Sequence, residues 1–276
     1  MWGNMRDFKV FKKNAEEKLY TQVKNAKQEF AFLCNGLLNI DTAEMITKKE
    51  MTNKEYKILN RAVNKRLKGV PLQLILGFTD FLGVEIIETK HTLKPRKETE
   101  LMVEKIIQNE SKDMAVLDMC AGSGCIGLAL KKAGFEEVTL SDISRHAIKM
   151  CIKNARLNHL AVSVVRSDMF KSIFGKFDMI VCNPPYIKSE DMHMLDREVR
   201  KFDPRIALDG GVDGLKFYRL IANESPKFLT DNGVLYLEIG QNQENAVVKL
   251  LQNNFKNITI IKDYNDINRI IRAEKC

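Results

Sequence analysis

The segment Val116–Gly127 (VLDMCAGSGCIG) constrains the fold of this chain more than any other. Its first residues, up to Met119, form a short apolar run that predicts a buried strand. The turn that follows contains Gly122, Gly124 and Gly127 in the spacing GxGxxG, and a helical pattern begins there. Glycine lets the backbone adopt positive φ and approach a ligand closely, while a helix N-terminus offers unpaired N–H groups. The segment therefore predicts a strand, a ligand-binding turn and a helix.

Beyond residue 114, strand patterns alternate with helix patterns. The predicted strands are 114–119, 137–141, 161–166, 177–182, 233–239, 258–262 and 267–272. The predicted helices are 126–132, 144–158, 214–229 and 243–253. Such alternation implies a mostly parallel sheet covered by helices on both faces. The predicted fold class is therefore α/β.

The first ninety residues show helical patterns instead. Thr52 and Glu55 match a capping box, which predicts a helix that runs to about Leu67. Basic residues share the polar face of this helix, here called the basic stripe: Lys54, Lys57, Arg61, Lys65 and Lys68. The stripe is either a solvated face or a docking surface for RNA or an acidic partner. After a break at residues 69–71, the segment 76–88 predicts a hairpin that links two domains.

Composition excludes several classes of protein. The chain has 276 residues, 45% of them hydrophobic, and a net charge of +8. No apolar run approaches the roughly 18 residues that a membrane helix needs. The segment 1–14 has charges and no apolar stretch, so we expect no secretory signal and a cytoplasmic protein. Six cysteines without a CxxC pair and four histidines favour buried thiols and no metal site.

An acidic residue follows the glycine-rich turn at a spacing typical of nucleotide-binding folds. Asp142 ends the next predicted strand, 20 residues after Gly122. A carboxylate in that place accepts hydrogen bonds from both hydroxyls of a ribose. The combination predicts an adenosine-type cofactor, and both NAD and S-adenosyl-L-methionine (SAM) fit. Asp118, within the first strand, is either a structural acid or a part of the cofactor network.

The tetrapeptide Asn183-Pro184-Pro185-Tyr186 follows the predicted strand 177–182, at an edge of the sheet where ligands bind. The Asn183 side-chain oxygen and the Pro184 carbonyl suit the two hydrogens of a planar NH₂ group. Tyr186 offers a ring face for a flat group. This arrangement favours methyl transfer to an amide or an exocyclic amine, because such nitrogens need positioning more than a base. We therefore expect SAM as the cofactor and assign catalytic roles to Asn183, Pro184 and Tyr186.

Further segments carry a resemblance to a known family. They are Pro71–Gly77 (PLQLILG), Pro95–Glu100 (PRKETE), Asp118–Gly127, Ser141–Ser144 (SDIS), Asn183–Ile187 (NPPYI), Phe202–Gly211 (FDPRIALDGG) and Glu238–Gln241 (EIGQ). Together they resemble the N5-glutamine methyltransferases of peptide chain release factors, the PrmC/HemK family. The chain departs from the family pattern at three places, with Leu74 for Tyr, Lys97 for Pro and Asp203 for Glu.

The resemblance implies a class I SAM-dependent methyltransferase domain, with a Rossmann-like seven-stranded sheet whose last strand is antiparallel. It implies a substrate-docking helical domain at 1–70, a hairpin linker at 71–95 and the methyltransferase domain at 96–276. The substrate is then the glutamine of a Gly-Gly-Gln motif in a release factor, contacted by Asn183 to Tyr186. The implied cofactor contacts are Cys120, Ala121, Gly122, Ser123, Gly124, Asp142, Asp168, Met169 and Asn183. We expect a monomer that needs no direct nucleic-acid binding.

Three other functions stay open from the residues alone. An adenine-N6 methyltransferase would use the same tetrapeptide, with a flipped base stacked on Tyr186. An NAD-dependent oxidoreductase would use the glycine-rich turn but leave residues 183–186 without a role. A non-catalytic RNA-binding module would use the basic stripe and leave the cofactor turn unexplained.

Overall fold

The computed structural model describes residues 5–276; the predicted first domain thus starts with residues 1–4 outside the described part. Contacts within the chain divide it into two compact units, and the division falls between Phe78 and Thr79. This point lies inside the segment 71–95 that we predicted as a linker. The two units are described separately below.

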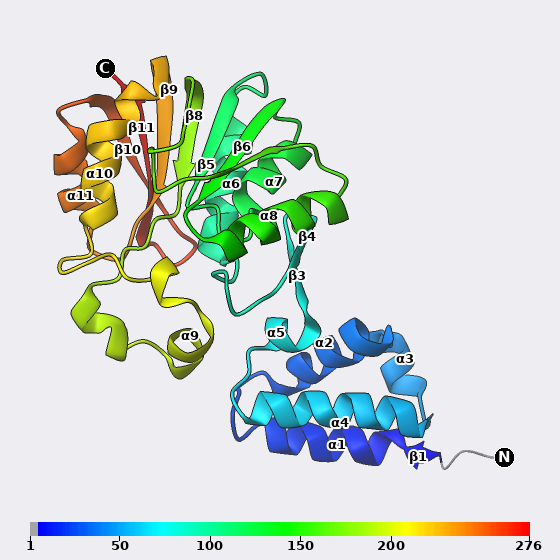
Figure 1. The fold of residues 1–276 in the computed structure, drawn as a ribbon. Helices are drawn as coiled ribbons and strands as arrows, with labels where there is room; N and C mark the ends of the chain where they lie inside the picture. Colours follow the sequence, from blue (N-terminus) through cyan, green and yellow to red (C-terminus); the bar gives the residue numbers. More distant parts are fainter. Residues whose placement is uncertain (1–4) are drawn as a thin grey trace. The chain divides into compact units, whose positions relative to one another are not determined.

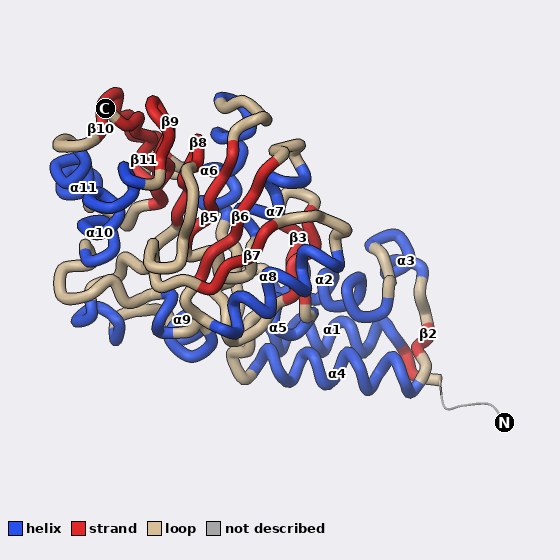
Figure 2. Tube along the Cα trace, turned by 45° about the horizontal axis from the view of Figure 1, so that its top comes forward, coloured by secondary structure: helices blue, strands red, loops and turns tan. Residues whose placement is uncertain are grey.

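The first unit consists mainly of helices, which Figure 2 distinguishes from the strands by colour. Its elements up to the last long helix are β1 (Arg6–Asp7), α1 (Phe8–Leu19), α2 (Ala26–Leu38), α3 (Thr42–Thr47), β2 (Glu50–Met51) and α4 (Asn53–Leu67). The two short strands pair with each other. The core between the helices contains fully buried Phe8, Phe30, Leu33 and Leu59. Phe30 and Leu33 lie three positions apart on the buried face of α2, a spacing typical of a helix packed on one side.

Helix α4 begins as its sequence predicts. The Thr52 hydroxyl accepts a hydrogen bond from the Glu55 amide, and the Glu55 carboxylate accepts one from the Thr52 amide. This reciprocal pair satisfies two amide groups that the first turn otherwise leaves unpaired. All five side chains of the basic stripe are exposed, and the opposite face of α4 packs into the core. The stripe therefore lies on the exposed face of α4.

A short helix and two strands follow. They are α5 (Leu72–Leu76), β3 (Phe78–Phe81) and β4 (Val84–Ile87). The two strands form a sheet of their own, so the predicted hairpin is present. The extended structure begins later than we predicted, because Leu76 still belongs to α5 and Gly77 ends that helix with a φ of 89°. Glycine adopts this left-handed conformation without strain.

The second unit is built on a seven-stranded sheet (Figure 1). Its strands are β5 (Ala115–Met119), β6 (Glu137–Asp142), β7 (Ser163–Arg166), β8 (Phe177–Cys182), β9 (Leu229–Glu238), β10 (Phe255–Lys262) and β11 (Asn268–Lys275). They lie in the order β10-β11-β9-β8-β5-β6-β7. The last strand, β11, inserts between β9 and β10 and runs antiparallel to both. The strands from β5 to β9 pair in parallel.

Helices cover both faces of this sheet. They are α6 (Lys97–Asn109), α7 (Cys125–Lys132), α8 (Arg145–Leu157), α10 (Lys216–Glu224) and α11 (Glu244–Leu251). Along β5, Val116 packs with one hydrophobic cluster and Leu117 with the other. The same alternation in β8 places Met179 and Ile180 on opposite faces, because successive side chains of a strand point to opposite sides. The α/β class predicted from the sequence is confirmed.

One predicted helix, 214–229, is wrong in extent. Helix α10 ends at Glu224, and strand β9 already begins at Leu229. The reason is Pro226, which has no N–H for a helical hydrogen bond and lies in a short 3₁₀ turn, η3 (Ser225–Lys227). The apolar residues on both sides of this proline had extended the helical pattern beyond its true end.

Candidate functional site

The candidate site lies along the carboxyl edge of the parallel strands. A cavity of about 230 Å³ opens there. The residues that line it include Cys120 after β5, Asp142 at the end of β6, Asp168 after β7 and Asn183 after β8. Strand β5 pairs with β6 on one side and with β8 on the other, so the chain crosses over at this point of the sheet. Ligands of open α/β sheets bind at such a crossover.

The glycine-rich turn and Asp142 are joined by hydrogen bonds. One carboxylate oxygen of Asp142 accepts the amide of Gly122 at 2.9 Å, and the other accepts the amide of Ser144 at 2.8 Å. Burial raises the pKa of Asp142, while these amide bonds act to lower it. Each oxygen keeps a further lone pair for the two hydroxyls of a ribose. The carboxylate is thus suited to hold a cofactor and already holds the turn.

Some of the predicted cofactor residues shape the turn without lining the cavity. Cys120, Gly122, Asp142, Asp168, Met169 and Asn183 line it, whereas Ala121, Ser123 and Gly124 do not. Gly124 precedes α7 with a φ of 84°, and a side chain there would press against Leu140 and Cys151. Gly124 therefore sets the path of the backbone in the turn.

Asp118 has a structural position. It is fully buried within β5, does not line the cavity, and accepts the amide of Gly127 at 2.9 Å. Burial raises the pKa of Asp118 to about 8. Of the two possibilities that the sequence left open, the geometry favours a group that joins β5 to the first turn of α7.

We expect Asp118→Asn to flatten the pH dependence of stability. The folded-state pKa of Asp118, about 8, exceeds the ordinary value of 3.8. Asp118 therefore contributes fully to the free energy of unfolding below pH 3.8, and this contribution is lost as the pH rises through 8. Between pH 6 and pH 8 the free energy of unfolding of the wild type should therefore fall by about 2 kcal/mol more than that of the variant. Urea unfolding at both pH values measures this difference. Parallel losses in the two proteins would contradict it, since other buried acids contribute equally to both.

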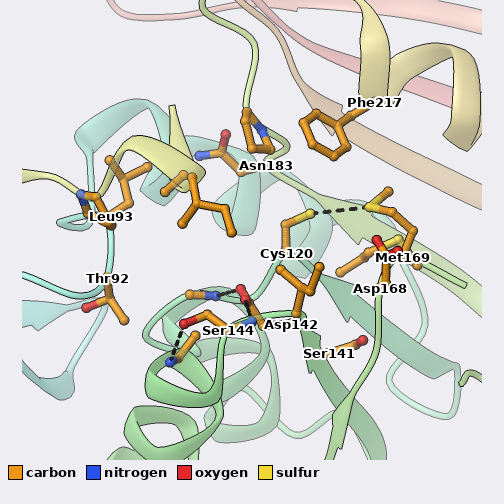
Figure 3. A pocket seen from close by; sticks show the side chains of 18 of the residues that line it. Thr92, Leu93, Cys120, Ser141, Asp142, Ser144, Asp168, Met169, Asn183 and Phe217 are labelled. Atoms are coloured by element: carbon orange, nitrogen blue, oxygen red, sulfur yellow. Dashed lines mark hydrogen bonds between the residues drawn. The ribbon is translucent and has the colours of Figure 1, made fainter. Parts of the chain in front are cut away.

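Asn183 lies between two cavities. It lines the first one and also a second cavity of about 260 Å³, whose lining includes Tyr186, Glu238 and Arg269. In Figure 3, Asn183 and Phe217 lie on one side of the first cavity, while Asp142 and Ser144 lie on the other. The Asn183 side chain donates from Nδ2 to the Thr99 hydroxyl at 3.3 Å, which leaves Oδ1 as an acceptor. A group in the second cavity would meet a cofactor in the first at Asn183.

Pro184, Pro185 and Tyr186 have different surroundings. Pro185 lines the first cavity and Tyr186 the second, while buried Pro184 lines neither. Within residues 5–276, no group donates a hydrogen bond to the Pro184 carbonyl. Burial raises the pKa of the Tyr186 hydroxyl, so that it stays protonated at neutral pH. The tetrapeptide thus offers an amide oxygen, a carbonyl oxygen and an aromatic ring.

Two distant segments support the tetrapeptide. Gly210 lies so close that a Cβ there would be 2.8 Å from the Pro185 oxygen and from Tyr186 Cα, so only glycine fits. Gln243 donates to the Tyr186 carbonyl at 3.0 Å and accepts the Gly240 amide at 2.9 Å. The family segments 202–211 and 238–241 therefore help to hold the turn at residues 183–186 in place.

The segment between β8 and α10 forms part of the site. Its elements are η1 (Ser189–His193), α9 (Arg197–Phe202) and η2 (Arg205–Ala207). Asp203, with a fully buried side chain, pairs with Lys94 and, at 2.9 Å, with Arg96. These ion pairs fix the segment to residues 94–96, and its residues Pro204, Ile206 and Ala207 line the first cavity. Asp203 stands where the family pattern has Glu, and its shorter side chain still reaches both Lys94 and Arg96.

The sequence missed several residues of the site. Thr92, Leu93 and Phe217 line the first cavity, and Glu238 with Arg269 lines the second. The resemblance had marked Glu238 as part of a family segment without a role. Thr92, Leu93 and Phe217 lie outside the quoted motifs, and only the folding of the chain brings them to the cavity.

Residues 5–276 hold neither a cluster of metal-ligating side chains nor a helix suited to a membrane. No group of three or more His, Cys, Asp or Glu side chains in residues 5–276 is placed to hold a metal ion. No helix in the same range has both the length and the apolar character to cross a membrane.

Comparisons with known proteins agree with this geometry. The family model "Methyltransferase small domain" matches residues 94–201, and the model "PrmC N-terminal domain" matches residues 13–77. A release factor glutamine methyltransferase from Thermodesulfovibrio yellowstonii is 35% identical over 260 residues, which cover 91% of this chain and 93% of the relative. The enzyme of the same name from Chlamydia trachomatis serovar L2 is 36% identical over 96% of this chain and 93% of its own.

Solved structures share the fold. A methyltransferase from Pyrococcus furiosus has a TM-score of 0.55 and 16% identity, and the match covers 70% of this chain and 89% of that one. A 16S rRNA N2 G1207 methyltransferase from T. thermophilus, in complex with AdoMet and guanosine, has a TM-score of 0.52 and 21% identity over 72% of this chain and 50% of that one. At these identities the likeness concerns the fold alone.

Proposed function

The chain belongs to the release factor glutamine methyltransferase family, and from this premise we propose that it methylates the side-chain amide nitrogen (N5) of the glutamine in the Gly-Gly-Gln motif of a release factor. SAM is the cofactor of this reaction. The observation that carries the proposal is the position of Asn183 at the boundary of two adjacent cavities. One cavity suits a nucleoside cofactor, and the other suits a small planar side chain.

The residues of the first cavity fit SAM. Asp142 offers two oxygens to a ribose, and the Gly122 backbone lies open to the same space. Met169 and Phe217 give the cavity apolar walls, against which an adenine packs. Cys120, whose sulfur lies 3.8 Å from that of Met169, faces the space between Asp142 and Asn183. When bound, SAM supplies a methyl group activated by a cationic sulfur.

Residues 183–186, of which Asn183 and Tyr186 line the second cavity, orient the glutamine. We assign the Asn183 oxygen and the Pro184 carbonyl to the two N–H groups of the substrate amide, and the Tyr186 ring to its flat face. Holding both hydrogens fixes the direction of the nitrogen, and such positioning lowers a barrier by up to roughly 7–11 kcal/mol. The same two acceptors stabilise the positive charge that develops on the nitrogen. No strong base is needed before attack, and the surplus proton leaves afterwards.

An assay with labelled SAM tests the proposal. The purified protein should transfer label to an unmodified release factor, and mass spectrometry should locate one added methyl group on the glutamine of the Gly-Gly-Gln motif. A release factor with that glutamine changed to alanine serves as the control. Label that enters only an oligonucleotide would contradict the proposal and favour the adenine-N6 reading, which the names of the relatives do not support.

The proposal extends to partners and place. A protein substrate needs no direct nucleic-acid binding, and the two cavities are lined by one chain, which is compatible with a monomer. Because release factors act in translation termination, we place the reaction in the cytoplasm. We further assign residues 1–70 to docking of the release factor.

For the basic stripe, we expect charge reversal to affect the whole substrate more than a peptide. Changing Lys57, Arg61 and Lys65 to Glu should raise the KM for a release factor about tenfold, because three attractive surface charges become repulsive. The KM for a short Gly-Gly-Gln peptide should stay within about twofold, since the peptide lacks the rest of the release factor that would meet the stripe. Steady-state kinetics with both substrates at two salt concentrations measure the effect. Equal changes in KM for the two substrates would mean that the stripe is only a solvated face.

A further inference from the structure

Behind Asn183 lies a chain of buried polar groups without a role so far. Thr99 in α6 and Glu238 at the end of β9 are 3% and 2% exposed. The Thr99 hydroxyl donates to a Glu238 carboxylate oxygen at 2.6 Å and accepts from Asn183 Nδ2 at 3.3 Å. The three residues come from separate parts of the chain, since Thr99 is 84 positions from Asn183 and 139 from Glu238.

The direction of these hydrogen bonds matters. A hydroxyl has one proton to donate, and an ionised carboxylate only accepts. With its proton committed to Glu238, Thr99 can only accept from Asn183, so the amide NH₂ must face Thr99 and Oδ1 must face the opposite way. A flipped amide would place Oδ1 against the lone pairs of Thr99 and lose the bond.

From these contacts, and resting on the proposed function, we propose that Thr99 and Glu238 are positioning residues that fix the orientation of the Asn183 amide. They present its oxygen to the N–H group of the substrate glutamine. Neither residue needs to touch the reacting atoms. A carboxamide turns over at little cost in free space, and a flipped Asn183 would meet the substrate NH₂ with its own NH₂. The acceptor would then be lost and a repulsive contact would replace it.

The surroundings of Glu238 agree with this role. Burial raises the pKa of Glu238 to about 7, against hydrogen bonds from Thr99 and Asn183 and the charge of Arg269, all of which lower it, so the ionised form that only accepts predominates above about pH 7. The main chain is fixed as well, because the buried Tyr218 hydroxyl donates to the Glu238 carbonyl at 2.9 Å. The carboxyl group is thus held at one place, next to the amide that it orients.

Steady-state methylation of a release factor by Thr99→Val and Thr99→Ser tests the proposal. Valine matches the shape of threonine without its hydroxyl, and serine keeps the hydroxyl. We expect T99V to lower kcat about 10–100-fold and T99S to stay within about threefold of wild type, with the Kd for SAM unchanged in both. Equal kcat values for T99V and wild type, or equal losses in T99V and T99S, would overturn the proposal.

A double-mutant cycle separates positioning from a general structural effect. If Thr99 acts through Asn183, T99V should add less than about threefold to the loss already caused by Asn183→Ala. Losses that multiply would show that Thr99 acts elsewhere. If T99V fails to bind SAM, Glu238→Gln replaces it, since a glutamine amide both donates and accepts and no longer dictates the direction of the Thr99 proton. An E238Q enzyme with the kcat of wild type would then overturn the proposal.

A readout without a substrate keeps this inference separate from the proposed function. The side-chain NH₂ protons of Asn183, assigned in an NMR spectrum by their absence in Asn183→Ala, should exchange with solvent about tenfold more slowly in wild type than in T99V. Equal exchange rates would overturn the orientation role even if the wild type methylates a release factor. Slow exchange in a protein that transfers no methyl group to any release factor would contradict the proposed function alone.

Discussion

Replacing Asn183 with alanine lowers kcat about 10²–10³-fold, as the removal of one hydrogen-bonding group at the transition state does in other enzymes. The loss arises because the substrate amide keeps only the Pro184 carbonyl as an acceptor and its nitrogen is no longer fixed in direction. The affinity for SAM should change by no more than about threefold, since Asp142 and the glycine-rich turn are untouched. Single-turnover kinetics and calorimetry with SAM measure the two quantities.

The matched control is Asn109→Ala. Asn109 ends α6 and is exposed, and its side chain makes none of the side-chain hydrogen bonds found among residues 5–276. Its replacement should leave kcat and the Kd for SAM as in wild type. An Asn183→Ala enzyme that binds SAM and turns over at nearly the normal rate would refute the role given to Asn183 and, with it, the proposed arrangement of the second cavity.

Replacing Asp142 with alanine has the second large effect, and it concerns binding. The variant loses a charged acceptor for each ribose hydroxyl, and the amides of Gly122 and Ser144 lose their partner. A loss of about 3 kcal/mol corresponds to about a 10²-fold higher Kd for SAM. At saturating SAM, kcat should fall by less than about tenfold, because the group that orients the substrate is intact.

Asp113→Ala provides the control for this variant. Asp113 is an exposed residue before β5 and lines neither cavity of the site. Calorimetric titration of SAM into Asp142→Ala, Asp113→Ala and the wild type measures the three Kd values. An Asp142→Ala protein with the Kd of wild type would mean that the ribose is held elsewhere, and the assignment of the first cavity would have to change.

Local patterns predicted most of the elements that carry the site. The strand before the glycine-rich turn, the acid at the end of β6 and the tetrapeptide after β8 all depend on neighbours within a few residues. Their positions follow from the chain order of strands and helices, because parallel strands bring their carboxyl ends to the same edge of a sheet. The hairpin and the capping box of α4 are also predictable, because they too depend on neighbours within a few residues.

The contacts across long intervals of sequence were not predictable in this way. The helix predicted at 214–229 failed at Pro226, where two apolar patterns met, and the bonds of Thr99 with Glu238 and Asn183 have no local signal. The resemblance pointed to the segments that contain Thr99 and Glu238 but not to what they contact. Phe217 reaches the cavity only because α10 packs into the same hydrophobic cluster as residues of the central strands.

By itself, the sequence determined the α/β class, the cofactor turn, the ribose acid and the tetrapeptide, since each depends on backbone preferences and side-chain periodicity over short distances. The tertiary structure alone decided that two cavities meet at Asn183, that Asp118 lies outside them, and which way the Asn183 amide faces. These features depend on which side chains fill the space between strands that are distant in sequence. Such packing follows from the whole fold and not from any single segment.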